Sequence, residues 1–158
     1  MKQKEMSHVL KALTVLSVFA CLVLMVVVLP FLAVHYVGDP ADTYLYWPFL
    51  LISWSGFLPI LVISAIAWGL FREIGQDNSF CEKNAQRLRL ISYLAVVGVA
   101  IWLAGVAFIV LTGVPAMGII VAFLMAMTIM LVLAITSTCL SHLTAKAAAL
   151  KLEQDLTV

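Results

Sequence analysis

The chain has 158 residues, of which 65% are apolar and 11% are charged. A soluble domain of ordinary composition is about half apolar and about a quarter charged, so this composition excludes that class and indicates a lipid bilayer as the solvent. The net charge is only +1, which indicates neither an acidic nor a basic partner.

Long stretches of the chain carry no Asp, Glu, Lys or Arg, namely residues 12–38, 43–71 and 90–145. A helix needs about 20 apolar residues to cross the hydrocarbon core, so the third stretch is long enough for two crossings. The predicted spans are about 13–34, 48–71, 90–111 and 116–138. We therefore predict an all-α fold, a polytopic membrane protein with four transmembrane helices in an up-down bundle, forming a single domain over residues 1–158.

The basic residues are distributed very unevenly along the chain. All nine Lys and Arg lie in the N-terminal tail, in a central loop at residues 72–89, or in a C-terminal tail at residues 139–158. Because basic residues concentrate on the cytoplasmic side of membrane proteins, we expect the N-terminus, the C-terminus and the central loop in the cytoplasm. The C-terminal tail is rich in strong helix formers, so an unbroken last helix would extend well beyond the lipid.

The central loop contains a helix start signal. Residues 79–82 match a capping box, which predicts that the third helix begins in water near Phe80. One face of this helix then carries Phe80, Asn84, Leu88 and Ile91. Two interpretations of this face are open: an amphipathic turn at the membrane interface, or a docking face for another protein.

Two features inside the spans concern helix packing. Pro59 removes a backbone donor near the middle of the second span, so we expect a kink there. Small residues recur at intervals of four in the fourth span, at Gly118, Ala122 and Ala126. Such residues let helices approach closely in lipid, either within the bundle or between two copies of the chain, so a homo-oligomer is left open.

The sequence offers little that resembles a reaction centre. The spans contain no Asp, Glu, Lys or Arg, which argues against proton-coupled transport. No nucleophile, histidine and acid combination or phosphate-binding loop can be assembled on one side of the membrane, so we do not expect an enzyme. His8 and His142 alone among the histidines share a side, and two ligands are few for a metal, so we expect no metal or cofactor.

Two further classes of interaction are not favoured by the sequence. The charges of residues 72–89 sum to only +1, which is too balanced to predict direct nucleic-acid binding. The three cysteines show no C-x-x-C spacing, and structural disulfides are not expected.

Two segments suggest a family. The stretch GQDNSFCEKNAQRLRLI at residues 75–91 and the ending LKLEQDLTV at residues 150–158 resemble the bacterial membrane-protein family called domain of unknown function 2975. Its members look like four-span proteins with a central loop of glycine, aromatic, small, acidic, Asn, then Arg or Lys and Leu. Cys81 stands where this pattern leads us to expect Ser or Thr.

The resemblance implies a multi-pass protein of the bacterial plasma (inner) membrane with an uncharacterised role. Family members are often encoded beside a small helix-turn-helix regulator, which implies a membrane partner or sensor for such a transcription factor. The motif positions that this resemblance marks as candidate partner-binding residues are Phe80, Asn84, Arg87, Leu88, Asp155, Leu156 and Thr157.

The leading hypothesis is a non-enzymatic membrane protein that binds a cytoplasmic protein in a regulatory or scaffolding role. It follows from the concentration of polar residues on the expected cytoplasmic side, while the spans lack reactive groups. The alternative is a small transporter or channel component, which requires a water-filled path lined by the serines of the spans.

Overall fold

The computed structural model describes residues 3–36, 43–75 and 81–156, and these residues contain helices and no strands. The elements are α1 (Gln3–Val23), a π-helical turn (Leu24–Val28), α2 (Leu29–Tyr36), a 3-10 turn (Thr43–Leu45), α3 (Tyr46–Ile74), α4 (Glu82–Thr112) and α5 (Met117–Leu156). Because α1, the π-helical turn and α2 are continuous, we call them together the first rod.

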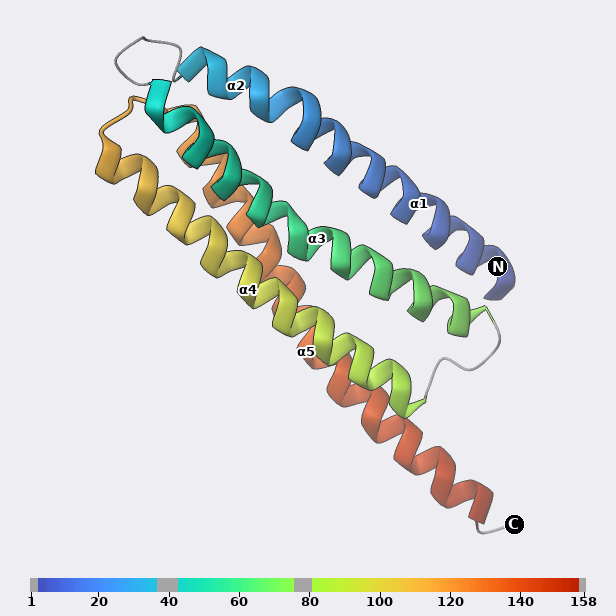
Figure 1. Cartoon of the computed structure of the whole chain (residues 1–158). Coiled ribbons are helices and arrows are strands. Elements are labelled where there is room, and N and C mark those ends of the chain that lie inside the picture. The colour runs from blue at the N-terminus through green and yellow to red at the C-terminus, as the bar shows by residue number, and fades with distance from the viewer. Residues whose placement is uncertain (1–2, 37–42, 76–80, 157–158) are drawn as a thin grey trace.

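Four rods are long and apolar enough to cross a membrane, as the sequence predicts. They cover Glu5–His35, Tyr46–Ile74, Glu82–Thr112 and Met117–Lys151. Successive rods run in opposite directions, so the predicted all-α, four-span, up-down fold is confirmed (Figure 1). The start of α1, the end of α3, the start of α4 and the end of α5 lie toward one end, which we call the charged end (residues 3–11, 72–75, 81–89 and 142–156).

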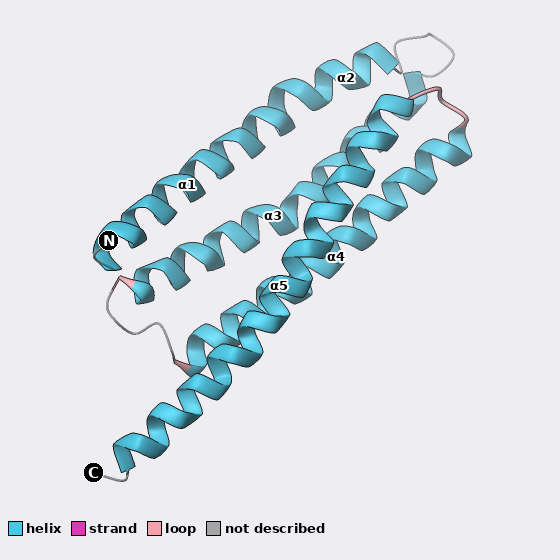
Figure 2. Cartoon of the chain, turned by 180° about the vertical axis from the view of Figure 1, so that it is seen from behind, coloured by secondary structure: helices cyan, strands magenta, loops and turns pink. Residues whose placement is uncertain are grey.

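The four rods do not contribute equally to the bundle. In both views α4 and α5 run side by side and α3 packs against α4, whereas the first rod lies along the outer side of α3 (Figures 1 and 2). Among the described residues, the backbone of the first rod closely approaches no other rod than α3. The first rod consequently exposes most of its apolar surface, which a bilayer would cover.

The π-helical turn has a local cause in Pro30. The amide of Leu29 donates to the carbonyl of Leu24, five residues back, in the wider π register. In that register the next amide would bond to the carbonyl of Met25, but Pro30 has no N–H to donate. The indole Nε1 of Trp54 on α3 donates to this carbonyl instead, at 3.0 Å. A side chain of the neighbouring helix therefore satisfies a backbone group that proline leaves open.

The main core lies around Trp102, between α3, α4 and α5, and also includes Leu29 and Ala33 of α2. The Trp102 indole packs against Phe57 with ring centroids 5.3 Å apart and against Phe123 at 4.6 Å. Glycines make room for these rings: a Cβ on Gly56 would lie 2.8 Å from the indole, and one on Gly105 would lie 2.9 Å from the Phe123 ring. A second cluster lies nearer the charged end and consists of Ile63, Ile91, Ala95, Met130 and Ala134.

The small residues of α5 do not form the predicted seam within the bundle. Gly118 and Ala122 are exposed, and Ala126 is only half-buried. The buried face of α5 instead carries large side chains such as Phe123 and Met130, and the glycines that face them, Gly105 and Gly98, are on α4. The small residues that let α4 and α5 approach closely are thus on α4.

Helix boundaries in the middle of the chain differ in part from expectation. Pro59 is buried in α3 and does not interrupt that helix, which ends before Gly75. The N-cap of α4 is Cys81, which makes no side-chain capping bond, so α4 begins slightly later than the predicted start near Phe80. Ser79 and Phe80 lie outside the described residues. Much of the predicted loop 72–89 is helical, because a helix does not have to end at the level where it leaves the lipid.

α5 is a single helix of 40 residues, and at 1.5 Å per residue it is about 60 Å long. This confirms that the last helix continues unbroken through the C-terminal tail. Its final turns project past the ends of α3 and α4 at the charged end (Figure 2).

Candidate functional site

The candidate residues of α4 lie on its inner face. Asn84 is 1% exposed and Leu88 is 7% exposed, and Ile91 continues the same buried face. The predicted shared face therefore exists, but the chain's own helices cover it. Whether these residues also contact a partner stays a prediction.

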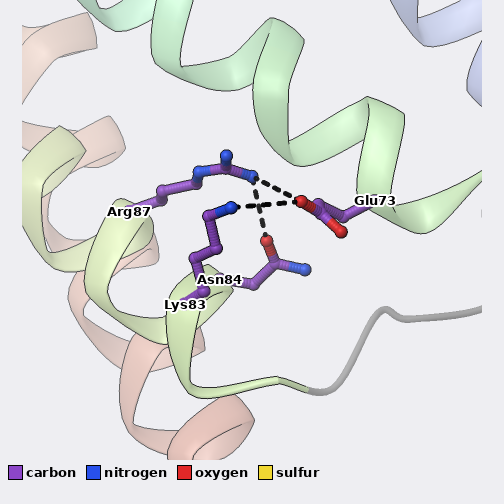
Figure 3. A network of polar contacts seen from close by, with 4 residues as sticks. All are labelled: Glu73, Lys83, Asn84 and Arg87. Carbon is purple, nitrogen blue, oxygen red and sulfur yellow. Dashed lines mark hydrogen bonds and ion pairs between the residues drawn. The ribbon is translucent and has the colours of Figure 1, made fainter.

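Asn84 and Arg87 belong to a polar network that joins α3 and α4 (Figure 3). Glu73, in the last turn of α3, faces both Arg87 Nη1 at 3.7 Å and Lys83 Nζ at 3.6 Å through its Oε1 atom. The same Nη1 atom of Arg87 donates to Asn84 Oδ1 at 3.4 Å. The network joins α3 and α4 at the charged end.

Because Gly69 has no side chain, the Arg87 guanidinium can lie close to the backbone of α3. A Cβ on Gly69 would lie 3.3 Å from the guanidinium carbon, so the arginine lies directly over the backbone of α3. The side chains of Arg87 and Glu73 are 24% and 20% exposed, which places the pair between water and the bundle interior. The Arg87 guanidinium thus holds α4 against α3, and its Nη1 atom faces Glu73 and Asn84.

Serine hydroxyls fix the other neighbouring rods at the same end. Ser7 Oγ of α1 donates to the carbonyl of Phe71 at 2.7 Å, and Ser141 Oγ of α5 donates to the carbonyl of Ala85 at 2.7 Å. Both serines are buried. Every neighbouring pair of rods is thus joined by a polar contact close to the charged end.

Of the four remaining candidates, Asp155, Leu156 and Thr157 lie at or beyond the end of α5, and Phe80 precedes α4 in the sequence. The backbone of Asp155 and Leu156 forms the last helical turn, and their side chains are not described. Phe80 and Thr157 lie outside the described residues. The structure therefore brings Asn84, Arg87 and Leu88 together and tests no contact of the other four.

The last part of α5, residues 142–156, which we call the α5 extension, exposes apolar side chains. Leu143 is 60% exposed and Leu150 is 62% exposed, with the half-buried Ala147 between them. Their spacing of four and three places them on one helical face. The uncharged interval 90–145 ends before Lys146, so Ala147 and Leu150 lie past it while Leu143 lies near its end. The end of α5 thus exposes apolar side chains next to and past the end of the uncharged interval.

The residues suited to metal or redox chemistry are scattered. Within the described ranges no three His, Cys, Asp or Glu side chains are placed to hold a metal ion. The three cysteines are all free thiols, with Cys21 buried, Cys81 partly buried and Cys139 exposed. The polar contacts at the charged end therefore join neighbouring helices, and α5 projects beyond them.

Sequence reasoning missed Glu73, although it is the shared acceptor of the network. The available signal was an acidic residue in the last turn of α3, close to a glycine, with basic residues at the start of the next helix. That pattern predicts an ion pair across a helical hairpin, but it does not identify which basic residue lies over the glycine.

Comparison with known families identifies the chain. A family model described as protein of unknown function (DUF2975) matches residues 33–158, which is most of the chain. The chain belongs to this family. Neither the curated proteins nor the solved structures gave a match. The DUF2975 match begins at Ala33, so α3, α4, α5 and the polar network lie within it and nearly all of the peripheral first rod precedes it.

Proposed function

We propose that this protein is a non-enzymatic membrane anchor of the bacterial plasma membrane that binds a cytoplasmic protein through the α5 extension. The observation that carries the proposal is the exposed apolar face of Leu143, Ala147 and Leu150 on a helix that projects from the bundle. Exposed apolar surface in water commonly marks a contact with another protein. An amphipathic helix of this kind fits an apolar groove on a partner.

The rest of the charged end supports such a role. The polar network of Glu73, Asn84 and Arg87 and the buried serines hold the rods together, so the extension starts from a fixed base. Binding of a partner to the projecting helix then costs little conformational entropy, because the helix is already formed. Asp155, Leu156 and Thr157 follow on the same segment and extend the proposed contact.

The proposed partner is a small helix-turn-helix transcription regulator, and the proposed role is to recruit or release it at the membrane. The family resemblance supports this class of partner. The balanced charge of the central loop is in keeping with protein binding in preference to direct nucleic-acid contact.

The transporter alternative is less well supported by the packing. Trp102, Phe123 and Met130 are each buried by 95% or more in the bundle interior, and Pro59 and Met130 close around Gly98. At the end of the core opposite the charged end, the cavity measures only about 10 Å³. A filled centre favours an anchor over a transporter.

Site-specific photocrosslinking in living cells tests the proposal. A photoreactive amino acid at Leu150 should give a discrete protein adduct, which mass spectrometry then identifies. The matched control is the same amino acid at Leu111, which is equally apolar and 86% exposed but lies at the opposite end of the bundle. The proposal fails if the two positions give the same adducts, or if position 150 reacts only with lipid.

A further inference from the structure

A groove of about 600 Å³ runs between α4 and α5 at the charged end. Its volume lies within the range of about 300–1,000 Å³ that is usual for small-molecule sites. It is separate from the polar network, because neither Glu73 nor Arg87 lines it. The residues that line it are Glu82, Ala85, Gln86, Arg89, Ser92, Tyr93, Val96, Thr138, Ser141, His142 and Ala145.

The lining changes in order from charged to apolar along α4. Glu82 begins the helix at the water-exposed end of the groove, and Arg89 lies two turns further in, about 10.5 Å along the axis. Arg89 is also the last charged residue before the uncharged interval 90–145. Beyond it the lining continues with Tyr93 and Val96. The groove therefore crosses the level at which lipid headgroups meet hydrocarbon.

At this groove α4 and α5 are held in register by serine and threonine hydroxyls, which already make hydrogen bonds within the protein. Ser92 Oγ lies 2.6 Å from Thr138 Oγ1 and 3.0 Å from the carbonyl of Ala134, and Ser141 donates to Ala85. The polar groups left to bind a ligand therefore include the ionic side chains, His142 and the Tyr93 hydroxyl. No acidic side chain in the described part of the chain pairs with Arg89, and Glu82 accepts only a long bond of 3.4 Å from Gln86.

We propose that this groove binds a phospholipid whose headgroup carries both a phosphate and a terminal ammonium. In such a lipid the phosphate lies nearer the hydrocarbon and the ammonium nearer the water. Arg89 is placed to bind the phosphate with its guanidinium donors, with His142 as a second donor, and Glu82 is placed to bind the ammonium. The start of the acyl chains then lies against Tyr93 and Val96.

The order of charges is what selects this headgroup. An anionic headgroup without an ammonium would also satisfy Arg89, but it would leave the Glu82 carboxylate facing a polar group with no positive charge. The assignment depends on depth in the membrane and is independent of which side faces the cytoplasm. It also uses a different surface from the proposed partner contact at Leu150.

Native mass spectrometry of the full chain tests this inference. The purified, delipidated protein is incubated with equal amounts of phosphatidylethanolamine and phosphatidylglycerol, and the bound copies of each are counted. The wild-type chain should retain more phosphatidylethanolamine. Arg89→Gln should retain about tenfold less of both lipids, because it removes a charge-assisted contact. Glu82→Gln should bind both lipids about equally.

The matched control is Arg72→Gln, an exposed arginine at the end of α3 that does not line the groove. It should retain lipid as the wild-type chain does, and circular dichroism should show equal helix content in all variants. The inference is wrong if Arg89→Gln retains as much lipid as Arg72→Gln. It is equally wrong if the wild-type chain prefers phosphatidylglycerol or shows no preference.

Discussion

At the scale of single residues, the clearest feature is the bond from Trp54 to the backbone of the first rod. The indole lies 29 positions along the chain from Met25, whose carbonyl it satisfies. Pro30 lacks the amide that would otherwise reach this carbonyl, and inside lipid no water is present to replace it. The contact therefore connects the most loosely packed rod to α3.

Trp54→Phe should weaken this attachment by about 1 kcal/mol, the usual contribution of a hydrogen bond between membrane helices. The thermal denaturation midpoint in detergent should fall. The control is Trp47→Phe, which changes an exposed tryptophan at the same end of α3. Equal midpoints for the two variants would show that the Trp54 bond contributes nothing.

Gly56 provides a second test at this scale. Alanine at this position would place its Cβ 2.8 Å from the Trp102 indole, so the ring or α3 must move. Gly56→Ala should destabilise the bundle by about 1–3 kcal/mol, as overpacking of a filled core does. Gly118→Ala, on the exposed face of α5, should leave the midpoint unchanged or raise it.

At the scale of elements, the polar network explains how α3 and α4 are kept in register at the charged end. Glu73 contributes the acceptor for both Arg87 and Lys83, and Gly69 allows the guanidinium to lie over α3. The distances of 3.6 and 3.7 Å are those of ion pairs without short hydrogen bonds. The network thus aligns the two helices more than it stabilises them.

Glu73→Gln should accordingly cost about 1 kcal/mol or less, because the pairs are partly exposed to solvent. High salt should reduce the stability difference between wild type and variant, since it screens the charges that the variant lacks. Unfolding in detergent at low and at high salt measures this. Glu5→Gln, which changes an exposed acid on α1, should show no such salt dependence. A difference for Glu73→Gln that does not change with salt would contradict an electrostatic origin.

The sequence predicts the elements well because burial of charge in lipid is so unfavourable. The uncharged intervals determine the four spans. The face that each helix buries was less predictable. In a span that is apolar all round, periodicity does not separate lipid-facing from core-facing residues, so the spacing of Gly118 and Ala122 did not show that they are exposed on the bundle.

The candidate site was predictable only in part. The spacing of Asn84, Leu88 and Ile91 correctly indicated one face of α4, and a family motif drew attention to Arg87. That this face is buried could not be read from the sequence, because it depends on α3 and α5 covering it. Glu73 and Trp54 act across helices, and a single sequence gives no register between helices.

At the scale of the whole molecule, the structure is a three-rod core with a peripheral first rod and one helix that projects from the charged end (Figure 1). The proposed function depends on that end facing the cytoplasm, which the distribution of basic residues predicts. Orientation is therefore the central claim of the account.

Labelling of single cysteines with a membrane-impermeant maleimide tests this claim most directly. In a chain whose three native cysteines are replaced by alanine, Leu150→Cys is compared with Tyr44→Cys, which is 73% exposed at the opposite end. We predict that Tyr44→Cys is labelled in intact cells and that Leu150→Cys is labelled only in inside-out vesicles. Labelling of Leu150→Cys from outside intact cells would contradict the orientation and, with it, the proposed cytoplasmic partner.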